Sequence, residues 1–407
     1  MAKTHTAQVA VVGAGPAGLT AALALSALGA DVAVAAPAFE AAQGSDRRTT
    51  ALLLGSVELL KNLRVWPYCE EYSAFLEGIR IVDDRGRLLR APEVLFKASE
   101  LGLASFGANL PNPALTSALN AAARRVRTIA FVDTVAVTGV EIGETCVRLQ
   151  LAEGGVLTAA LVVAADGRNS IVRKAAGIAT RTWDHGQAAI AASFRHTRAH
   201  DGITTELHRQ NGPLTTVPLP GLASSLVWVE APSEANRLAA LDDGAFLAAL
   251  EERLQGLLGS LADVTPRALH PLAGLHAERM AHNRIALVGE AAHVLPPIGA
   301  QGLNLSLRDA AALAECVADA RSRGEDIGGA ETLAAYHQAR TADVVSRNAS
   351  IELLNRSLLA DFLPLQALRG LGLHLLANAA PLRRLAVRGG LEPAGPLPRL
   401  MRPGALS

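Results

Sequence analysis

The sequence Gln8-Val9-Ala10-Val11-Val12-Gly13-Ala14-Gly15-Pro16-Ala17-Gly18 lies near the start of this chain of 407 residues and decides its fold class. An apolar run ends at Val12, the spacing Gly13-x-Gly15-x-x-Gly18 follows, and residues 16–28 are rich in Ala and Leu. This order predicts a strand, a tight turn and a helix. A second apolar run over residues 31–35 predicts the next strand, which makes half of a doubly wound α/β sheet.

The glycines of this turn have separate physical roles in dinucleotide binding. Gly13 permits the tight turn, Gly15 lets the backbone approach a pyrophosphate, and Gly18 lets the helix pack close to the strand. Together with Ala17, they would hold phosphates at the helix N-terminus, where backbone N–H groups attract anions. A purely structural turn is the alternative, but the position between a strand and a helix favours a dinucleotide.

One expected partner is missing at the end of the second strand. An Asp or Glu usually meets the ribose hydroxyls there, whereas this chain reads Val34-Ala35-Ala36-Pro37. Glu40 and Asp46 follow shortly afterwards and are candidates to substitute, although such loop acids are more often simply solvated.

The composition excludes several classes of protein. Apolar residues make up 50% and charged residues 19%, which is the balance of a folded chain, and the length suggests about two or three domains. A formal net charge of zero without a basic block argues against nucleic acid as a partner. Three separated cysteines suit a reducing compartment. Because neither a secretory signal nor an apolar run of about 18 residues is present, we expect a cytoplasmic protein with at most peripheral membrane contact.

Two further segments place polar residues at the ends of predicted buried strands. The first reads Val163-Ala164-Ala165-Asp166-Gly167, with a helix expected near Ser170, and on its own it is equally compatible with a turn and a helix cap. The second reads Gly289-Glu290-Ala291-Ala292-His293, followed by the loop Pro296-Pro297-Ile298-Gly299-Ala300-Gln301-Gly302-Leu303-Asn304. This glycine-rich loop feeds a helix expected to start near Leu303, whose N-terminus would stabilise anionic charge.

The three segments together resemble those of the FAD-dependent aromatic-ring hydroxylases, single-component flavoprotein monooxygenases of the p-hydroxybenzoate hydroxylase type, and most closely their ubiquinone-biosynthesis branch. The resemblance covers nearly the whole chain. It implies that the Gly13 segment binds the ADP part of FAD and that Asp166 and Gly167 lie near the pyrophosphate. It also implies that the third segment holds the ribitol and the flavin ring.

Within the third segment, the resemblance assigns a role to each polar or glycine position. The implied cofactor contacts are Gly289, Glu290, Gly302, Leu303 and Asn304, and the residues implied to face the flavin, as part of the catalytic site, are Pro296 and Pro297. The family usually has Asp where this chain has Glu290, so one extra methylene has to be accommodated.

Three more residues are candidates for a site. Asp46-x-Arg48-x-x-Ala51-Leu52 resembles a family element in which the residue matching Arg48 contacts the cofactor, the alternative being a surface arginine. His185 stands where the ubiquinone branch often carries a tyrosine, so it is a candidate for catalytic proton transfer, with a structural hydrogen bond as an equal alternative. His293 is expected to be structural, and no metal site is expected, because no other ligand residue has suitable spacing.

The resemblance and the order of elements predict an α/β fold. A Rossmann-like three-layer FAD/NAD(P)-binding domain is interrupted by a mixed-sheet substrate domain and followed by a helical C-terminal region. We expect the cofactor domain over residues 1–75, 105–180 and 278–345, the substrate domain over 76–104 and 181–277, and the helical region over 346–407, broken at Pro364, Gly370, Gly372 and Pro381.

The implied activity is hydroxylation of the aromatic ring of a prenylated phenol in ubiquinone biosynthesis. FAD reduced by NAD(P)H or another donor would react with O2 to a C4a-hydroperoxide, which transfers an oxygen atom to the ring. Other ubiquinone-biosynthesis proteins are candidate partners. Residues 353–391 combine leucines with arginines, which suits either a peripheral helix on the inner membrane face or core packing.

Alternatives to the hydroxylase remain. A prenyl-chain reductase would share all three FAD segments, and a non-catalytic flavin-binding subunit of a quinone-biosynthesis complex would tolerate the changes at Ala36 and Glu290. A flavin halogenase is disfavoured, because Trp66, Trp183 and Trp228 form no Trp-x-Trp motif.

Overall fold

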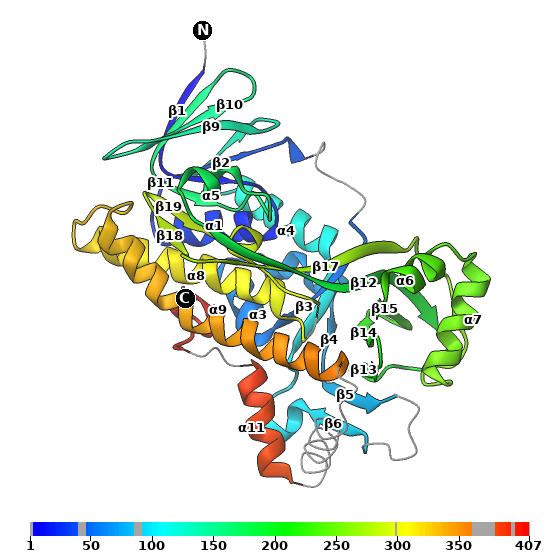
Figure 1. The fold of residues 1–407 in the computed structure, drawn as a ribbon. Coiled ribbons are helices and arrows are strands. Elements are labelled where there is room, and N and C mark those ends of the chain that lie inside the picture. The colour runs from blue at the N-terminus through cyan, green and yellow to red at the C-terminus, as the bar shows by residue number, and fades with distance from the viewer. Residues whose placement is uncertain are drawn as a thin grey trace.

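The computed structural model describes residues 3–39, 46–84, 92–297, 299–359, 379–391 and 395–406. Its strands form three sheets, and its helices pack on and between them (Figure 1). The α-helices discussed below are α1 (Pro16–Ala27), α3 (Leu54–Asn62), α4 (Asn112–Arg124), α5 (Ile171–Ala175), α6 (Pro232–Ala239), α7 (Asp243–Leu254), α8 (Gln301–Ser322), α9 (Ala330–Leu359) and α11 (Ala380–Leu391). Short 3₁₀ turns include η3 (Ala98–Leu101), η4 (Gly289–Ala291) and η5 (Arg399–Met401).

The first sheet carries the predicted dinucleotide frame. Its strand order is β18 (Ala281–His282), β19 (Ile285–Leu287), β11 (Val156–Ala164), β1 (Thr4–Val12), β2 (Val32–Ala36) and β8 (Ile129–Asp133). A ribbon of β9 (Val137–Ile142) and β10 (Val147–Leu151) extends from β11. The strands β1 and β11 are parallel, with Val12 opposite Ala164, so the chain leaves both strands at the same edge of the sheet.

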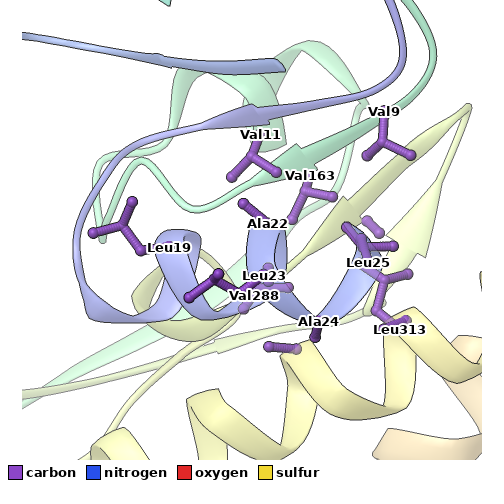
Figure 2. Packing of buried hydrophobic residues seen from close by; sticks show 14 of the residues in the cluster. Val9, Val11, Leu19, Ala22, Leu23, Ala24, Leu25, Val163, Val288 and Leu313 are labelled. Atoms are coloured by element: carbon purple, nitrogen blue, oxygen red, sulfur yellow. The ribbon is translucent and has the colours of Figure 1, made fainter. Parts of the chain in front are cut away.

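Helix α1 forms because it is apolar on every side and is buried on every side. Pro16 occupies its first position, where the missing N–H costs no hydrogen bond. Leu19, Leu23 and Leu25 are almost completely buried, and Figure 2 shows this helix packed among side chains of the sheet and Leu313 of α8. Burial of each leucine contributes roughly 1.5–3 kcal/mol.

The second sheet is mostly antiparallel. Its strand order is β20 (His293–Val294), β17 (Ala268–Ala277), β12 (Thr180–His196), β15 (Ala223–Glu230), β14 (Gly212–Leu219), β13 (Ile203–Arg209), β5 (Gly78–Asp83) and β6 (Val94–Lys97), with β16 (Leu261–Ala262) beside β12. Phe246 and Leu250 of α7 pack on Trp228 and Phe194 of this sheet in a separate hydrophobic cluster. Strands of the predicted substrate domain therefore share one sheet, which β20 also joins.

A third, three-stranded sheet consists of β3 (Thr49–Leu53), β7 (Gly107–Pro111) and β4 (Ala74–Phe75). It contacts the second sheet, because Asn109 donates a hydrogen bond to the carbonyl of Pro218 at 2.9 Å. The hydroxyl of Thr49 also donates to Ser225 at 2.8 Å. No pattern in the sequence indicated β3 or α3.

Several predicted elements are confirmed, with shifted ends. The helix expected over residues 16–28 corresponds to α1, and the helix expected to start near Leu303 corresponds to α8, which starts earlier, at Gln301. The predicted break at Pro381 agrees with the structure, because Ala379 is not helical and α11 starts at Ala380, with Pro381 in its first turn, where proline is tolerated. The predicted breaks at Pro364, Gly370 and Gly372 lie outside the described residues. None of the helices in the described part of the chain is long and apolar enough to span a membrane.

Candidate active site

The Gly13 turn and the Asp166 turn touch each other at the edge of the first sheet. Gly13 has φ +108°, and a Cβ atom there would lie 2.4 Å from the carbonyl oxygen of Ala165. A Cβ atom at Gly18 would lie 2.0 Å from the carbonyl oxygen of Gly13. Two of the glycines are therefore required by the protein itself, and this close approach brings the first two predicted segments together.

Gly15 and Gly302 are glycines that the protein itself does not require. Apart from chain neighbours and the backbone of the same helix, no heavy atom of the described residues lies within 4 Å of the position of a Cβ at either residue, and Gly15 has an ordinary φ of −73°. Both stand at helix starts, Gly15 immediately before α1 and Gly302 in the first turn of α8. Open space beside two helix N-termini fits a ligand that carries negative charge and needs close backbone approach, as FAD does.

Asp166 caps a helix and keeps one oxygen unused. Its Oδ2 accepts hydrogen bonds from the backbone N–H groups of Ile171 at 3.0 Å and Val172 at 3.4 Å. Its Oδ1 is buried and has no hydrogen-bond partner in the described structure. Asp166 can therefore cap the helix with one oxygen and bind a cofactor with the other. A buried acceptor without a partner is costly unless a ligand supplies a donor.

Charged side chains from the second and third segments and from the Arg48 element gather beside these turns. Glu290, presented by η4, lies 3.5 Å from the Nε of Arg168, which follows the Asp166 turn. The neighbouring carboxylate of Asp46 holds Arg48 by two side-chain hydrogen bonds of 2.8 and 2.9 Å. The Asp46 carboxylate, followed by the charge of Glu290, raises the pKa of Arg48, so this side chain stays a fixed cation.

Glu40 and Asp46 were the two acids considered as replacements for the missing ribose-binding carboxylate. Asp46 is committed to Arg48 and also accepts a hydrogen bond from Asn112 at 3.1 Å. Glu40 lies outside the described residues. Ala36 ends β2 as expected and is almost fully buried.

A buried ionic network fixes the turn that carries Glu290. The carboxylate of Asp309 on α8 is fully buried and accepts from His293 Nε2 at 2.7 Å, from Arg340 Nε at 2.8 Å and from the N–H of Gly289 at 3.2 Å. Burial alone would raise the pKa of Asp309, but His293 and Arg340 outweigh it, and the pKa lies below the ordinary value of 3.8. His293 therefore has the structural role that the sequence indicated.

The start of α8 is attached to β3 by one side chain. Asn304 accepts from the N–H of Leu53 at 2.8 Å and donates to the carbonyls of Ala51 at 2.8 Å and Ala300 at 2.6 Å. Ala300 has a left-handed backbone with φ +54° and begins the helix without a side-chain cap. The first N–H groups of α8 are thus left for another acceptor.

A cleft of 180 Å³ lies where the charged residues face the second sheet. Arg48, Arg168, Glu290 and Pro297 line one part of it, and strand residues such as Ala191, Val227 and Leu272 line the other. Pro297 is exposed to the cleft, whereas Pro296 is buried and is not among the lining residues. The two prolines, which were both predicted to face the flavin, therefore have different surroundings.

His270 of β17 also lines this cleft, and no motif in the sequence pointed to it. Its Nε2 has no hydrogen-bond partner in the described structure. Burial, followed by the positive charge of Arg48, lowers its pKa below the ordinary 6.5. His270 reaches the cleft because β17 pairs with β12, where His270 lies opposite Ala189. No motif in the sequence around His270 predicts that pairing.

His185, the histidine singled out from the sequence, lies on β12 outside the lining of this cleft. Its Nε2 accepts a hydrogen bond from Trp183 Nε1 at 3.1 Å. This contact matches the structural alternative, and its catalytic role stays a prediction.

Comparisons with known proteins agree with this geometry. A family model described as FAD binding domain matches residues 6–348. The chain is 35% identical to the ubiquinone hydroxylase UbiL of Rhodospirillum rubrum, over 97% of this chain and 92% of that protein. It is 30% identical to the 3-demethoxyubiquinol 3-hydroxylase of Escherichia coli, over 94% and 98% of the two chains.

The fold is also found among solved structures. The p-nitrophenol 4-monooxygenase PnpA from Pseudomonas putida superposes with a TM-score of 0.77 at 18% identity, over 96% of this chain and 99% of that one. The chain therefore belongs to the FAD binding domain family and, within it, to the ubiquinone-biosynthesis hydroxylases.

Proposed function

We propose that this chain is an FAD-dependent monooxygenase that hydroxylates the aromatic ring of a prenylated phenol. The observation that carries the proposal is the cleft in which Arg48, Glu290 and the proline loop face apolar strands of the second sheet. A cofactor held by the charged side and an aromatic ring held by the apolar side would meet inside one cleft.

Bound FAD would supply the redox chemistry, namely activation of O2 after reduction by NAD(P)H or another donor. The cofactor would be held by residues of all three segments, through Gly13, Gly15, Ala17 and Gly18 at α1, through Asp166 and Gly167, and through Arg48, Gly289 and Glu290. The N–H groups of Gly302 and Leu303, in the first turn of α8, would stabilise negative charge at the ring edge. Asn304 would support them by holding α8 against β3.

The protein also has to position the phenol and manage its proton. Ala191, Val227 and Leu272 offer an apolar surface that excludes water from the ring. His270 is neutral near pH 7, because its pKa is lowered, and its Nε2 has no other partner. We assign it the role of accepting the phenolic proton, for which a neutral imidazole is suited.

The test starts with the absorbance spectrum of the purified protein, in which bound flavin is expected. Oxidation of NAD(P)H should then be stimulated by a prenylated phenol, with one hydroxylated product per O2 consumed. A preparation that takes up no added FAD would identify a non-catalytic relative. Reduction of the prenyl chain without O2 would identify a reductase instead.

A further inference from the structure

A second cavity, of 540 Å³, shares no lining residue with the cleft. Its apolar wall comes from separate chain segments, at β3 and α3, after η3, and near η5. The residues of that wall are Leu53, Leu54, Leu101, Leu103, Leu397 and Met401. Its volume lies within the range of about 300–1,000 Å³ that is usual for ligand sites.

Two polar residues of this cavity, Asn304 and Arg308, are already held by the protein. Asn304 uses its amide group on β3 and on Ala300. Arg308 is buried and holds the carboxylate of Asp343 through two hydrogen bonds of 2.9 and 2.7 Å. Arg388 of α11 is the other charged lining residue and is exposed. No His, Cys, Tyr, Lys or acid is among the described lining residues.

The walls of the cavity are held in place by specific contacts. Near η5, the N–H of Leu400 donates to Glu315 of α8 at 3.0 Å, and Asn62 of α3 donates to the carbonyl of Leu400 at 2.8 Å. Arg383 of α11 pairs with Glu100 of η3 at 2.9 Å. The cavity is therefore a built feature and not a gap between loosely packed segments.

The cavity and the cleft lie at the two ends of one short strand. Thr49 lines the cleft and Leu53 lines the cavity, and both belong to β3. Four steps along a strand separate them by about 13 Å. Asn304 lines the cavity and also stands in the first turn of α8, where the flavin edge is expected.

We infer that this cavity binds the isoprenoid chain of the substrate while the ring occupies the cleft. The inference rests on the proposed function, because only a prenylated phenol has both a ring and a branched apolar chain. The six apolar residues of the wall favour a hydrocarbon chain, whereas the exposed Arg388 can stay hydrated beside it. Each added isoprenoid unit that enters should raise affinity by at least about tenfold.

The test uses ring-free probes, so that it does not depend on hydroxylation. Geraniol and farnesol are titrated into the FAD-loaded full chain by calorimetry, below the concentrations at which the alcohols aggregate. Farnesol should bind at least about tenfold more tightly than geraniol, with a negative heat-capacity change. Decanol and dodecanol are the straight-chain comparisons, and equal binding of dodecanol and farnesol would overturn the isoprenoid assignment.

Two variants fill the cavity from opposite walls. Leu103→Trp and Leu397→Trp should each weaken farnesol binding by at least about tenfold. The matched control is Leu247→Trp, because Leu247 is half-buried against the separate cluster of the second sheet and does not line the cavity. Unchanged farnesol affinity in both cavity variants would overturn the inference. An equal loss of farnesol affinity in the control variant would also overturn it. Melting curves check that each variant folds.

A second measurement links the cavity to catalysis. The ratio of kcat/KM for a long-chain phenol to that for a short-chain phenol should exceed ten in the wild type and fall towards one in Leu103→Trp. An unchanged ratio would overturn the inference. If no phenol is hydroxylated at all, the proposed function fails, whereas farnesol binding still decides what the cavity holds.

Discussion

The imidazole of His293 lies 2.7 Å from the carboxylate of Asp309, and both side chains are buried. The same carboxylate accepts from the N–H of Gly289, so one acid on α8 fixes both ends of the short segment that presents Glu290. Helix α9 completes the arrangement through Arg340. The position of Glu290, the residue predicted to bind the ribitol, therefore depends on the ionic contact between His293 and Asp309.

Replacing Asp309 by asparagine should lower both stability and FAD affinity. The substitution keeps the shape but removes the charge that compensates Arg340, and breaking such a buried pair costs about 3 kcal/mol. Denaturant unfolding and flavin titration measure the two effects. Asp263→Asn, at an exposed side chain, is the control, and equal effects of both variants would contradict the assignment.

The same contact predicts a pH dependence. The pKa of Asp309 is lower in the folded chain than its ordinary 3.8, so the unfolded chain binds this proton more readily. Its stabilising contribution is complete above pH 3.8 and is lost as the pH falls through the folded pKa. The stability difference between wild type and Asp309→Asn should therefore shrink in strong acid, and a constant difference would be inconsistent with it.

His270 should determine the acidic limb of the activity profile. Burial, Arg48 and Arg168 lower its pKa, whereas Asp46 and Glu290 oppose them, and the result lies below 6.5. The neutral form needed to accept a proton is thus present at pH 7 and is lost only below pH 6.5. His270→Asn should reduce kcat by about 10²-fold and remove this limb. His185→Asn is the comparison, and a larger loss there would favour the histidine chosen from the sequence.

Gly15 should be required for FAD and not for folding. In Gly15→Val, the new Cβ has no described protein atom within 4 Å apart from its chain neighbours, and the side chain would enter the space left for the pyrophosphate. The dissociation constant for FAD should therefore rise at least about tenfold. The melting temperature of the cofactor-free protein should shift by no more than about 3 °C. Gly389→Val in α11, which is equally open, should leave FAD binding unchanged.

Glu290 should bind FAD through its charge. Glu290→Gln should weaken FAD binding about 10- to 100-fold, because a hydrogen bond to a charged group contributes about 1.5–3 kcal/mol. Stability should change little, since the contact with Arg168 is half-exposed. Glu252→Gln, at a more exposed acid, is the control. Wild-type affinity in Glu290→Gln, measured by flavin fluorescence, would exclude this residue as a ligand.

The parts of the site that were predictable follow from local sterics. Gly13 and Gly18 predict a tight turn, because a side chain at either position would collide with the backbone. Asp166 follows a buried apolar strand that can be recognised in the sequence. His270 was not predictable, since it reaches the cleft only through its pairing with Ala189. The strand β3 was missed for the same reason, because its partner β7 lies far along the chain. The start of α8 was misplaced, because Ala300 turns the backbone into the helix before Leu303.

The parallel pairing of β1 with β11 also has a consequence during synthesis of the chain. Thr4 pairs with Val156, so β1 has no partner on that side until more than 150 further residues have been made. At about 5–20 residues per second, this interval is on the order of 10 s. An apolar strand with an open edge is the surface that chaperones protect, so we expect the yield of folded protein to depend on translation speed and chaperone supply more than on the stability of the finished fold.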